Sequence, residues 1–156
     1  MLETPGGDAK DASDARVAAA NYFARAIRGN ETDYRALYKY WRIRTQKGDA
    51  PDMRLQDVLV QAYNLAPQVP EIALSAGLML LGVNRAVEAR VVLNKLAGDP
   101  HSEKLSATAR RLVALIDALP PGRAATAAEI TSALAAPAEP PAQPSGEPPA
   151  PGKPAT

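Results

Sequence analysis

Glycine and proline residues interrupt this chain of 156 residues at short, nearly regular intervals, and this spacing constrains the fold more than any other feature. Both residue types end helices, glycine through its backbone freedom and proline because it has no N–H donor. Between the interruptions, apolar residues recur every three or four positions, as on one face of a helix, and no alternating β-branched run indicates a strand. We therefore predict an all-α chain of about six helices, joined as antiparallel hairpins by short turns. The interruptions are Gly29-Asn30, Gly48, Pro67, Gly82-Val83-Asn84, Gly98-Asp99-Pro100 and Pro120-Pro121-Gly122.

The composition agrees with close helix packing. Hydrophobic residues make up 46% of the chain, but much of that share is alanine, and there are only one Phe, one Trp and five Tyr. Helices that approach closely over alanine suit such a chain better than a β-sandwich, which needs more β-branched and aromatic side chains.

Several helix starts are predicted from residues that satisfy or tolerate the free N–H groups of a first turn. Thr32 is the expected N-cap of the second helix, Pro51 and Pro70 are expected in the first turns of the third and fourth, and Ser102 is expected to cap the sixth. Asn84 tolerates the left-handed conformation that a tight turn requires. The predicted helices span about residues 14–28, 33–47, 51–65, 70–81, 85–97 and 103–118.

The chain divides by composition into three parts. Residues 1–12 have little to bury and are expected to be disordered, whereas 13–119 form the repeat domain. The Ala/Pro-rich tail, 120–156, is expected to be mostly disordered, with a short helix over 126–135 capped by Thr126. Its last 20 residues hold eight of the 15 prolines, which favours a polyproline-II-like conformation.

The fourth predicted helix is apolar on nearly every side. Leu74, Leu78 and Leu81 form one face, and the opposite face is apolar as well. A helix of this kind is normally buried on both sides. We expect neighbouring helices of the same chain to cover it, rather than a partner or a second copy.

Small residues recur at fixed spacing within the fourth and fifth predicted helices. They form the pattern Ala73-x3-Gly77-x2-Leu80, followed by Ala89-x3-Leu93 and closed by Pro100. The pattern resembles the tetratricopeptide repeat, in which small residues let paired helices approach closely. Ala73 stands where that family often has Trp, and the repeat is one residue short before its proline. The resemblance covers residues 31–100 and implies hairpins stacked as a short right-handed solenoid.

The second predicted helix combines an aromatic stripe with a basic one. Both stripes follow the i, i+4, i+7 spacing of one helix face. They consist of Tyr34, Tyr38 and Trp41, and of Arg35, Lys39 and Arg42.

The resemblance implies that the first helix of each hairpin lines a concave groove. By register, the partner-binding positions are then Arg35, Tyr38 and Arg42, followed by Glu71, Leu74 and Leu78 in the next repeat. This surface would present cations to a carboxylate or to an acidic peptide. The alternative is that the aromatic stripe belongs to the core and the basic stripe is a solvated face.

No constellation of catalytic residues is found, and we expect no enzymatic activity, cofactor or metal in this chain. His101 is the only histidine, there is no Cys, and no glycine-rich phosphate loop occurs. A net charge of +1 and the absence of a known module motif argue against nucleic-acid binding. No apolar run reaches the length of a membrane span, and the cytosol and the periplasm fit the composition equally well.

These observations favour a scaffold that binds a protein, a peptide or another domain of its own chain. The N-terminus looks like the start of a fragment, so we expect the native protein to be longer. Residues 30–115 resemble the C-terminal repeat region of some bacterial multidomain proteins with a peptidase-like domain upstream. An accessory domain of an enzyme whose active site lies N-terminal to this chain is the alternative, and a structural repeat that mediates self-association is the third.

Overall fold

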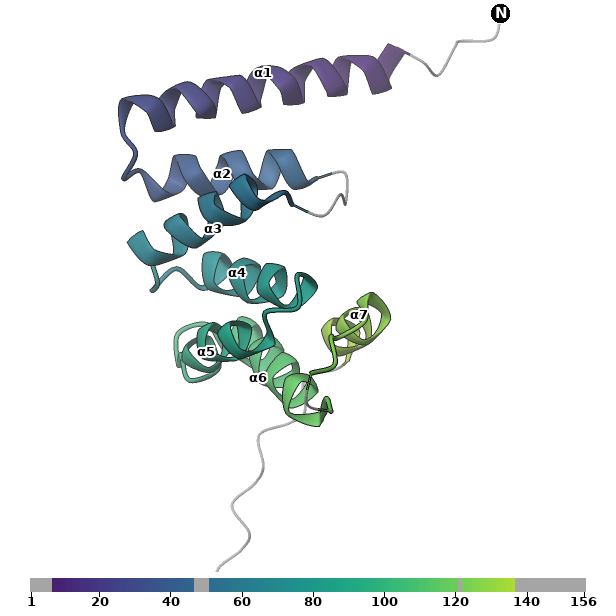
Figure 1. Cartoon of the computed structure of the whole chain (residues 1–156). Coiled ribbons are helices and arrows are strands. Elements are labelled where there is room, and N and C mark those ends of the chain that lie inside the picture. Colours follow the sequence, from purple (N-terminus) through teal and green to yellow (C-terminus); the bar gives the residue numbers. More distant parts are fainter. Residues whose placement is uncertain (1–6, 47–50, 121, 137–156) are drawn as a thin grey trace, which may run out of the picture.

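The computed structural model describes residues 7–46, 51–120 and 122–136, and within them every regular element is a helix. This confirms the all-α prediction, with a seventh helix beyond the six expected in the repeat domain. Figure 1 shows α1 to α6 following one another from the top of the view to the bottom. The helices are α1 (Gly7–Gly29), α2 (Tyr34–Thr45), α3 (Met53–Leu65), α4 (Pro70–Gly82), α5 (Ala86–Ala97), α6 (Glu103–Ala118) and α7 (Ala127–Ala135).

Each helix packs against the next one in the chain, and α4 also contacts α6. The turn between α4 and α5 has only three residues, and Asn84 adopts a positive φ of 61° there, as its side chain was expected to allow. None of the described helices is long and apolar enough to span a membrane.

The core lies along α4 and its neighbours. On α4, seven residues are buried, including Ile72, Ala76 and Leu80, while Leu74 and Leu78 are partly buried against the same core. Leu81 is also buried, so both faces of this helix are covered within the chain, as predicted. The largest fully buried apolar side chains are Leu37, Leu59, Ile72, Leu81, Leu93 and Leu112.

α4 and α5 are in close contact at a glycine. A Cβ atom added to Gly77 would lie 2.5 Å from Leu93 Cδ2 and 2.6 Å from its Cγ. Ala89, on the same face of α5 as Leu93, is fully buried. The two small residues of the sequence pattern therefore lie in the hairpin interface.

A buried hydroxyl fastens the end of α5 to α6. Ser106 Oγ lies 2.9 Å from the carbonyl oxygen of Leu96 and 2.6 Å from that of Asp99. The Leu96 carbonyl also accepts from the Asp99 backbone at 3.0 Å, so the Ser106 hydroxyl adds a second connection between the end of α5 and α6. Ser102 occupies the N-cap position of α6, but its side chain makes no capping hydrogen bond, contrary to our expectation.

One predicted cap and one predicted first-turn residue are wrong. The N-cap of α2 is Asp33 and not Thr32, whose N–H and hydroxyl both donate to Asn30 Oδ1. The N-cap of α3 is Asp52, whose Oδ1 accepts from the backbone of Leu55 at 2.8 Å, so Pro51 lies just before the helix. In both cases the N-cap is an aspartate, whose carboxylate also favours the positive helix end. The predicted C-terminus of the second helix, at Lys47 and Gly48, lies outside the described residues.

The first helix begins earlier than predicted. It starts at Gly7 and not near Asp14, so residues 7–12 are helical although we expected disorder there. Alanines at positions 9 and 12 favour a helix there. Residues 1–6 lie outside the described part of the chain.

The packed body also extends further than predicted. We expected it to end at residue 119, but α7 packs against α6, and Ala125, Ile130 and Ala133 contact the core. Its start agrees with the sequence: the Thr126 hydroxyl accepts from the Glu129 backbone, and the Glu129 carboxylate accepts from the Thr126 backbone in return. Gly122, with a φ of +80°, supplies the left-handed step in the connection that precedes it.

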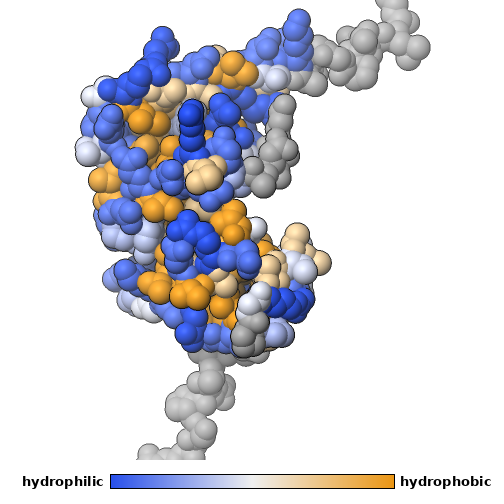
Figure 2. Space-filling view, in the orientation of Figure 1, coloured by the Kyte–Doolittle hydropathy of each residue, from blue (hydrophilic) through white to orange (hydrophobic). Residues whose placement is uncertain are grey.

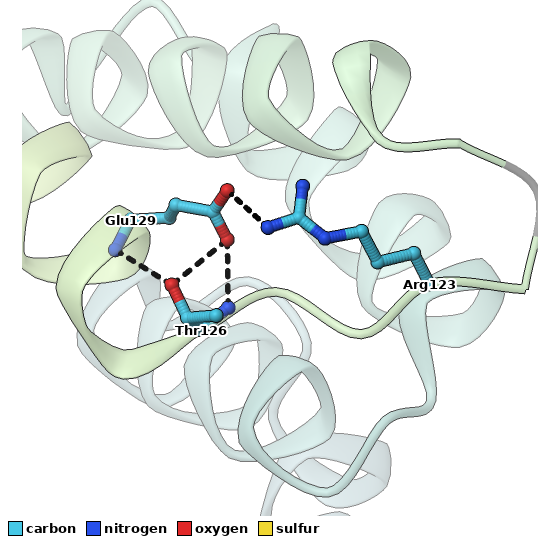
Figure 3. Close-up of polar contacts among 3 residues, drawn as sticks. All are labelled: Arg123, Thr126 and Glu129. Atoms are coloured by element: carbon cyan, nitrogen blue, oxygen red, sulfur yellow. Dashed lines mark hydrogen bonds and ion pairs between the residues drawn. The ribbon is translucent and has the colours of Figure 1, made fainter.

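The start of α7 is held by one carboxylate, as Figure 3 shows. Glu129 accepts from the backbone and hydroxyl of Thr126 at 2.8 and 2.9 Å, and from the Arg123 guanidinium at 2.7 Å. The hydrogen bond from the Thr126 backbone, followed by those from the Thr126 hydroxyl and Arg123, lowers the pKa of Glu129 below its ordinary 4.5. The predicted tail from residue 137 onward lies outside the described residues.

Candidate functional site

The candidate site is built on α2, whose register is set by its N-cap. Asp33 Oδ1 accepts from the backbone of Arg35 at 3.0 Å and of Ala36 at 3.3 Å. Ala36 and Leu37 are then buried, which turns Arg35 and Arg42 to the solvent. The cap therefore determines which side of α2 carries the cations.

The aromatic stripe of α2 lies at the edge of the core. Tyr34, Tyr38 and Trp41 are all partly buried and pack against the central cluster. The rings of Tyr38 and Trp41 are stacked, with centroids 6.1 Å apart and planes 10° from parallel. Each ring thus has one side in the core and another near the surface.

Tyr38 links α2 to α4, although α3 separates these helices in the sequence. Its hydroxyl lies 3.0 Å from Ser75 Oγ and 3.4 Å from the carbonyl oxygen of Glu71. Ser75 Oγ itself donates to that carbonyl at 2.8 Å, so in this arrangement Tyr38 donates to Ser75. Two of the six predicted site residues, Tyr38 and Glu71, are therefore in direct contact.

The other four predicted residues lie beside this link. Arg42 is one turn from Tyr38 on α2, and Arg35 is one turn away in the other direction. On α4, Leu74 and Leu78 are partly buried and adjacent to Ser75 on the helix surface, whereas the Glu71 side chain is exposed. The arrangement combines exposed cations, one carboxylate and a shallow apolar strip. We name this set of six residues the α2–α4 face.

Every basic residue of α2 lies over an aromatic ring. Such cation–π contacts orient the side chain and leave its polar edge free. The distances from the charged group to the ring centroid are 5.3 Å for Arg35 over Tyr34, 5.8 Å for Lys39 over Phe23 of α1, 5.9 Å for Arg42 over Tyr38 and 6.0 Å for Arg44 over Tyr40.

A cleft of about 440 Å³ was not predicted from the sequence. It lies between the loop that precedes α4 and the loop that precedes α6, and Lys95, Asp99 and His101 contribute to its wall. Asp99 Oδ1 accepts from the backbone N–H of His101 at 2.9 Å, so this carboxylate shapes the turn. The register of the two hairpins could have predicted this cleft, because it places the loops that close both hairpins on the same side of the protein.

A third surface is the groove between α3 and α5, with a volume of about 250 Å³. Val87 and Val91 of α5 line it and are 80% and 56% exposed. The Tyr63 hydroxyl is buried in this region without a hydrogen-bond partner in the described structure. In Figure 2, hydrophobic side chains reach the surface near α4 and α5, whereas hydrophilic ones cover most of the α1–α2 end.

No group of three or more His, Cys, Asp or Glu side chains that could hold a metal ion occurs among the described residues. Comparison of the chain with models of protein families, with curated proteins and with solved structures gave no match. The geometry of the α2–α4 face is therefore the basis for a functional proposal.

Proposed function

We propose that the chain is a scaffold that binds a polypeptide partner across the α2–α4 face. The observation that supports this most is the contact of Tyr38 with Ser75 and Glu71, which joins the first helices of two successive hairpins into one surface. A surface shared by two hairpins is longer than one helix provides, which suits an extended or helical peptide.

We also propose that the hairpins α2–α3 and α4–α5 are tetratricopeptide-like repeats in a short right-handed solenoid. The close approach of Gly77 to Leu93 and the complete burial of Ala89 support this, because these are the positions where the sequence pattern requires small residues. In that arrangement α2 and α4 would both line the concave side, and the contact of Tyr38 with Ser75 supports this proposal by bringing the two helices together.

The proposal is tested by selecting peptides from a random display library on the whole chain and mapping the bound peptide by NMR. We expect the amide shifts that change most to lie on α2 and α4, around Tyr38 and Leu78. Shifts that gather on the α3–α5 groove or around His101 would contradict the assignment, and so would a library that yields no binder.

Tyr38→Ala supplies a second measurement. Because the ring is partly buried and its hydroxyl bonds to α4, we expect both weaker peptide binding and a loss of stability of about 1–3 kcal/mol, less than for a fully buried aromatic residue. Tyr38→Phe keeps the ring and is expected to preserve most of the stability. A large stability loss with unchanged binding would make Tyr38 purely structural.

A further inference from the structure

The positive charge of this protein is concentrated on one helix. α2 contains four basic residues and, within its span, no Asp or Glu. Residues 51–136, by contrast, contain eight basic and eight acidic side chains. The imbalance is therefore local to the helix that also carries half of the α2–α4 face.

The cations of α2 are not neutralised within the described part of the chain. The ion pairs found there join Arg85 to Glu88, Arg90 to Asp117 and Arg123 to Glu129, all outside α2. The nearest carboxylate in sequence, Asp33, accepts from two backbone N–H groups as the N-cap. Arg35, Lys39, Arg42 and Arg44 are all exposed.

The cation–π contacts orient two of these side chains, whose guanidinium groups can bind carboxylates. Arg35 and Arg42 lie over Tyr34 and Tyr38, and neither guanidinium forms an ion pair among the described residues. A guanidinium binds a carboxylate through its N–H edge with two parallel hydrogen bonds. Lys39 lies over Phe23 of α1, which draws it away from α4.

Resting on the proposed function, we infer that the partner segment is acidic, with carboxylates that reach Arg35 and Arg42. These residues are seven positions apart, which is about 10 Å along a helix. A peptide in the polyproline-II conformation rises about 3.1 Å per residue with three residues per turn, so side chains three positions apart lie on one face, about 9 Å apart. Acidic side chains at every third position therefore match the spacing of the two guanidinium groups.

Glu71 provides a second test of the same surface. It is the one carboxylate of the α2–α4 face, and its backbone contacts Tyr38, next to Arg42. Removing its charge takes away a local repulsion for an acidic peptide. Glu71→Gln is thus expected to tighten binding, by about two- to threefold for an exposed charge.

The experiment measures fluorescence anisotropy of a labelled peptide with glutamate at every third position, using the whole chain. We expect R35A/R42A to weaken binding about tenfold or more, since two charge-assisted contacts are lost. The matched control R54A/K104A removes two charges from exposed positions on α3 and α6 and is expected to change affinity less than about twofold. The same peptide with glutamine for glutamate is expected not to bind measurably, and added salt should weaken the acidic one.

Three results would overturn the inference. One is equal weakening by the control variant, which would show attraction to net charge alone. Another is tighter binding of single-stranded DNA or of anionic phospholipid vesicles than of the peptide. The third is a set of display-selected peptides that map to α2 and α4 but are not acidic and ignore R35A/R42A, and in that case the proposed function survives. If no selected peptide maps to α2 and α4, the proposed function itself fails.

Discussion

Replacing Gly77 with alanine tests the close contact between α4 and α5. The added methyl carbon would lie 2.5 Å from Leu93 Cδ2 and 2.6 Å from Cγ, whereas non-bonded carbons prefer about 3.5–4.0 Å. Leu93 is 0% exposed, so its side chain has no free space to move into. Overpacking of this kind costs about 1–3 kcal/mol. Alanine is better than glycine inside a helix by about 1 kcal/mol, which offsets part of that cost.

Subtracting the helix-propensity gain from the overpacking cost leaves an expected net loss of about 1–2 kcal/mol in the free energy of unfolding for Gly77→Ala. This value lies in the upper part of the resulting range because the added carbon would approach two Leu93 atoms. Urea denaturation followed by circular dichroism measures it. Gly82→Ala is the matched control, because a Cβ there meets no atom within 4 Å and φ is not positive. We expect the control to be neutral or slightly stabilising.

A double-mutant cycle then attributes the effect to this contact. Leu93→Ala alone should cost about 2–5 kcal/mol through the cavity that it leaves. In the G77A/L93A variant the new methyl group no longer meets Leu93. The stability loss of the double variant should therefore be smaller than the sum of the two single losses, by about 1 kcal/mol or more. Additive losses, or a Gly77→Ala variant as stable as the Gly82 control, would refute the close approach of α4 and α5.

Truncation after Gly122 is expected to lower the melting temperature, because α7 then no longer covers α6, whereas truncation after Ala136 is expected to leave it unchanged. Equal melting temperatures for the two variants would mean that α7 does not contribute to stability. Ala89→Leu is expected to destabilise the protein by roughly 1–3 kcal/mol in urea denaturation, and a silent substitution would place Ala89 outside the hairpin interface. Hydrogen bonds from Thr126 lower the pKa of Glu129 in the folded state, so its stabilising effect is present above the ordinary value of 4.5 and is lost as the pH falls through the lowered folded value. The helical population of α7, measured by NMR chemical shifts, should decrease over that range before the other helices change.

Helix positions were predictable where one residue type leaves few alternatives. Pro70 occupies the first turn of α4, and Asn84 adopts the left-handed turn conformation, both as expected. The cap predicted at Thr32 and the helix start predicted at Pro51 were wrong because each has an aspartate after it, and the path of the backbone makes that aspartate the cap. Residue propensity alone does not decide which of two adjacent residues becomes the N-cap.

The packing of α7 was not predictable for a different reason. Its contacts with the core come from Ile130 and Ala133 of the helix and from Ala125 of the preceding connector, a small apolar surface within an Ala/Pro-rich stretch. The site shows the same limit: spacing placed Arg35 and Arg42 on one side of a helix, but the link between Tyr38 and Ser75 joins residues 37 positions apart. Only the relative placement of two hairpins brings those hydroxyls together.

The stacking of each helix on its neighbour has a mechanical consequence. Force applied to the two ends of the helical body acts first on α1 and α7, each of which packs mainly against one other helix. These end helices should detach one at a time at low force, since few contacts must break together. α4, which contacts α3, α5 and α6 and is tied to α2 through Tyr38, would be released last. Under tension the folded body would thus lose helices from its two ends. The α2–α4 face would stay assembled until the outer helices have detached.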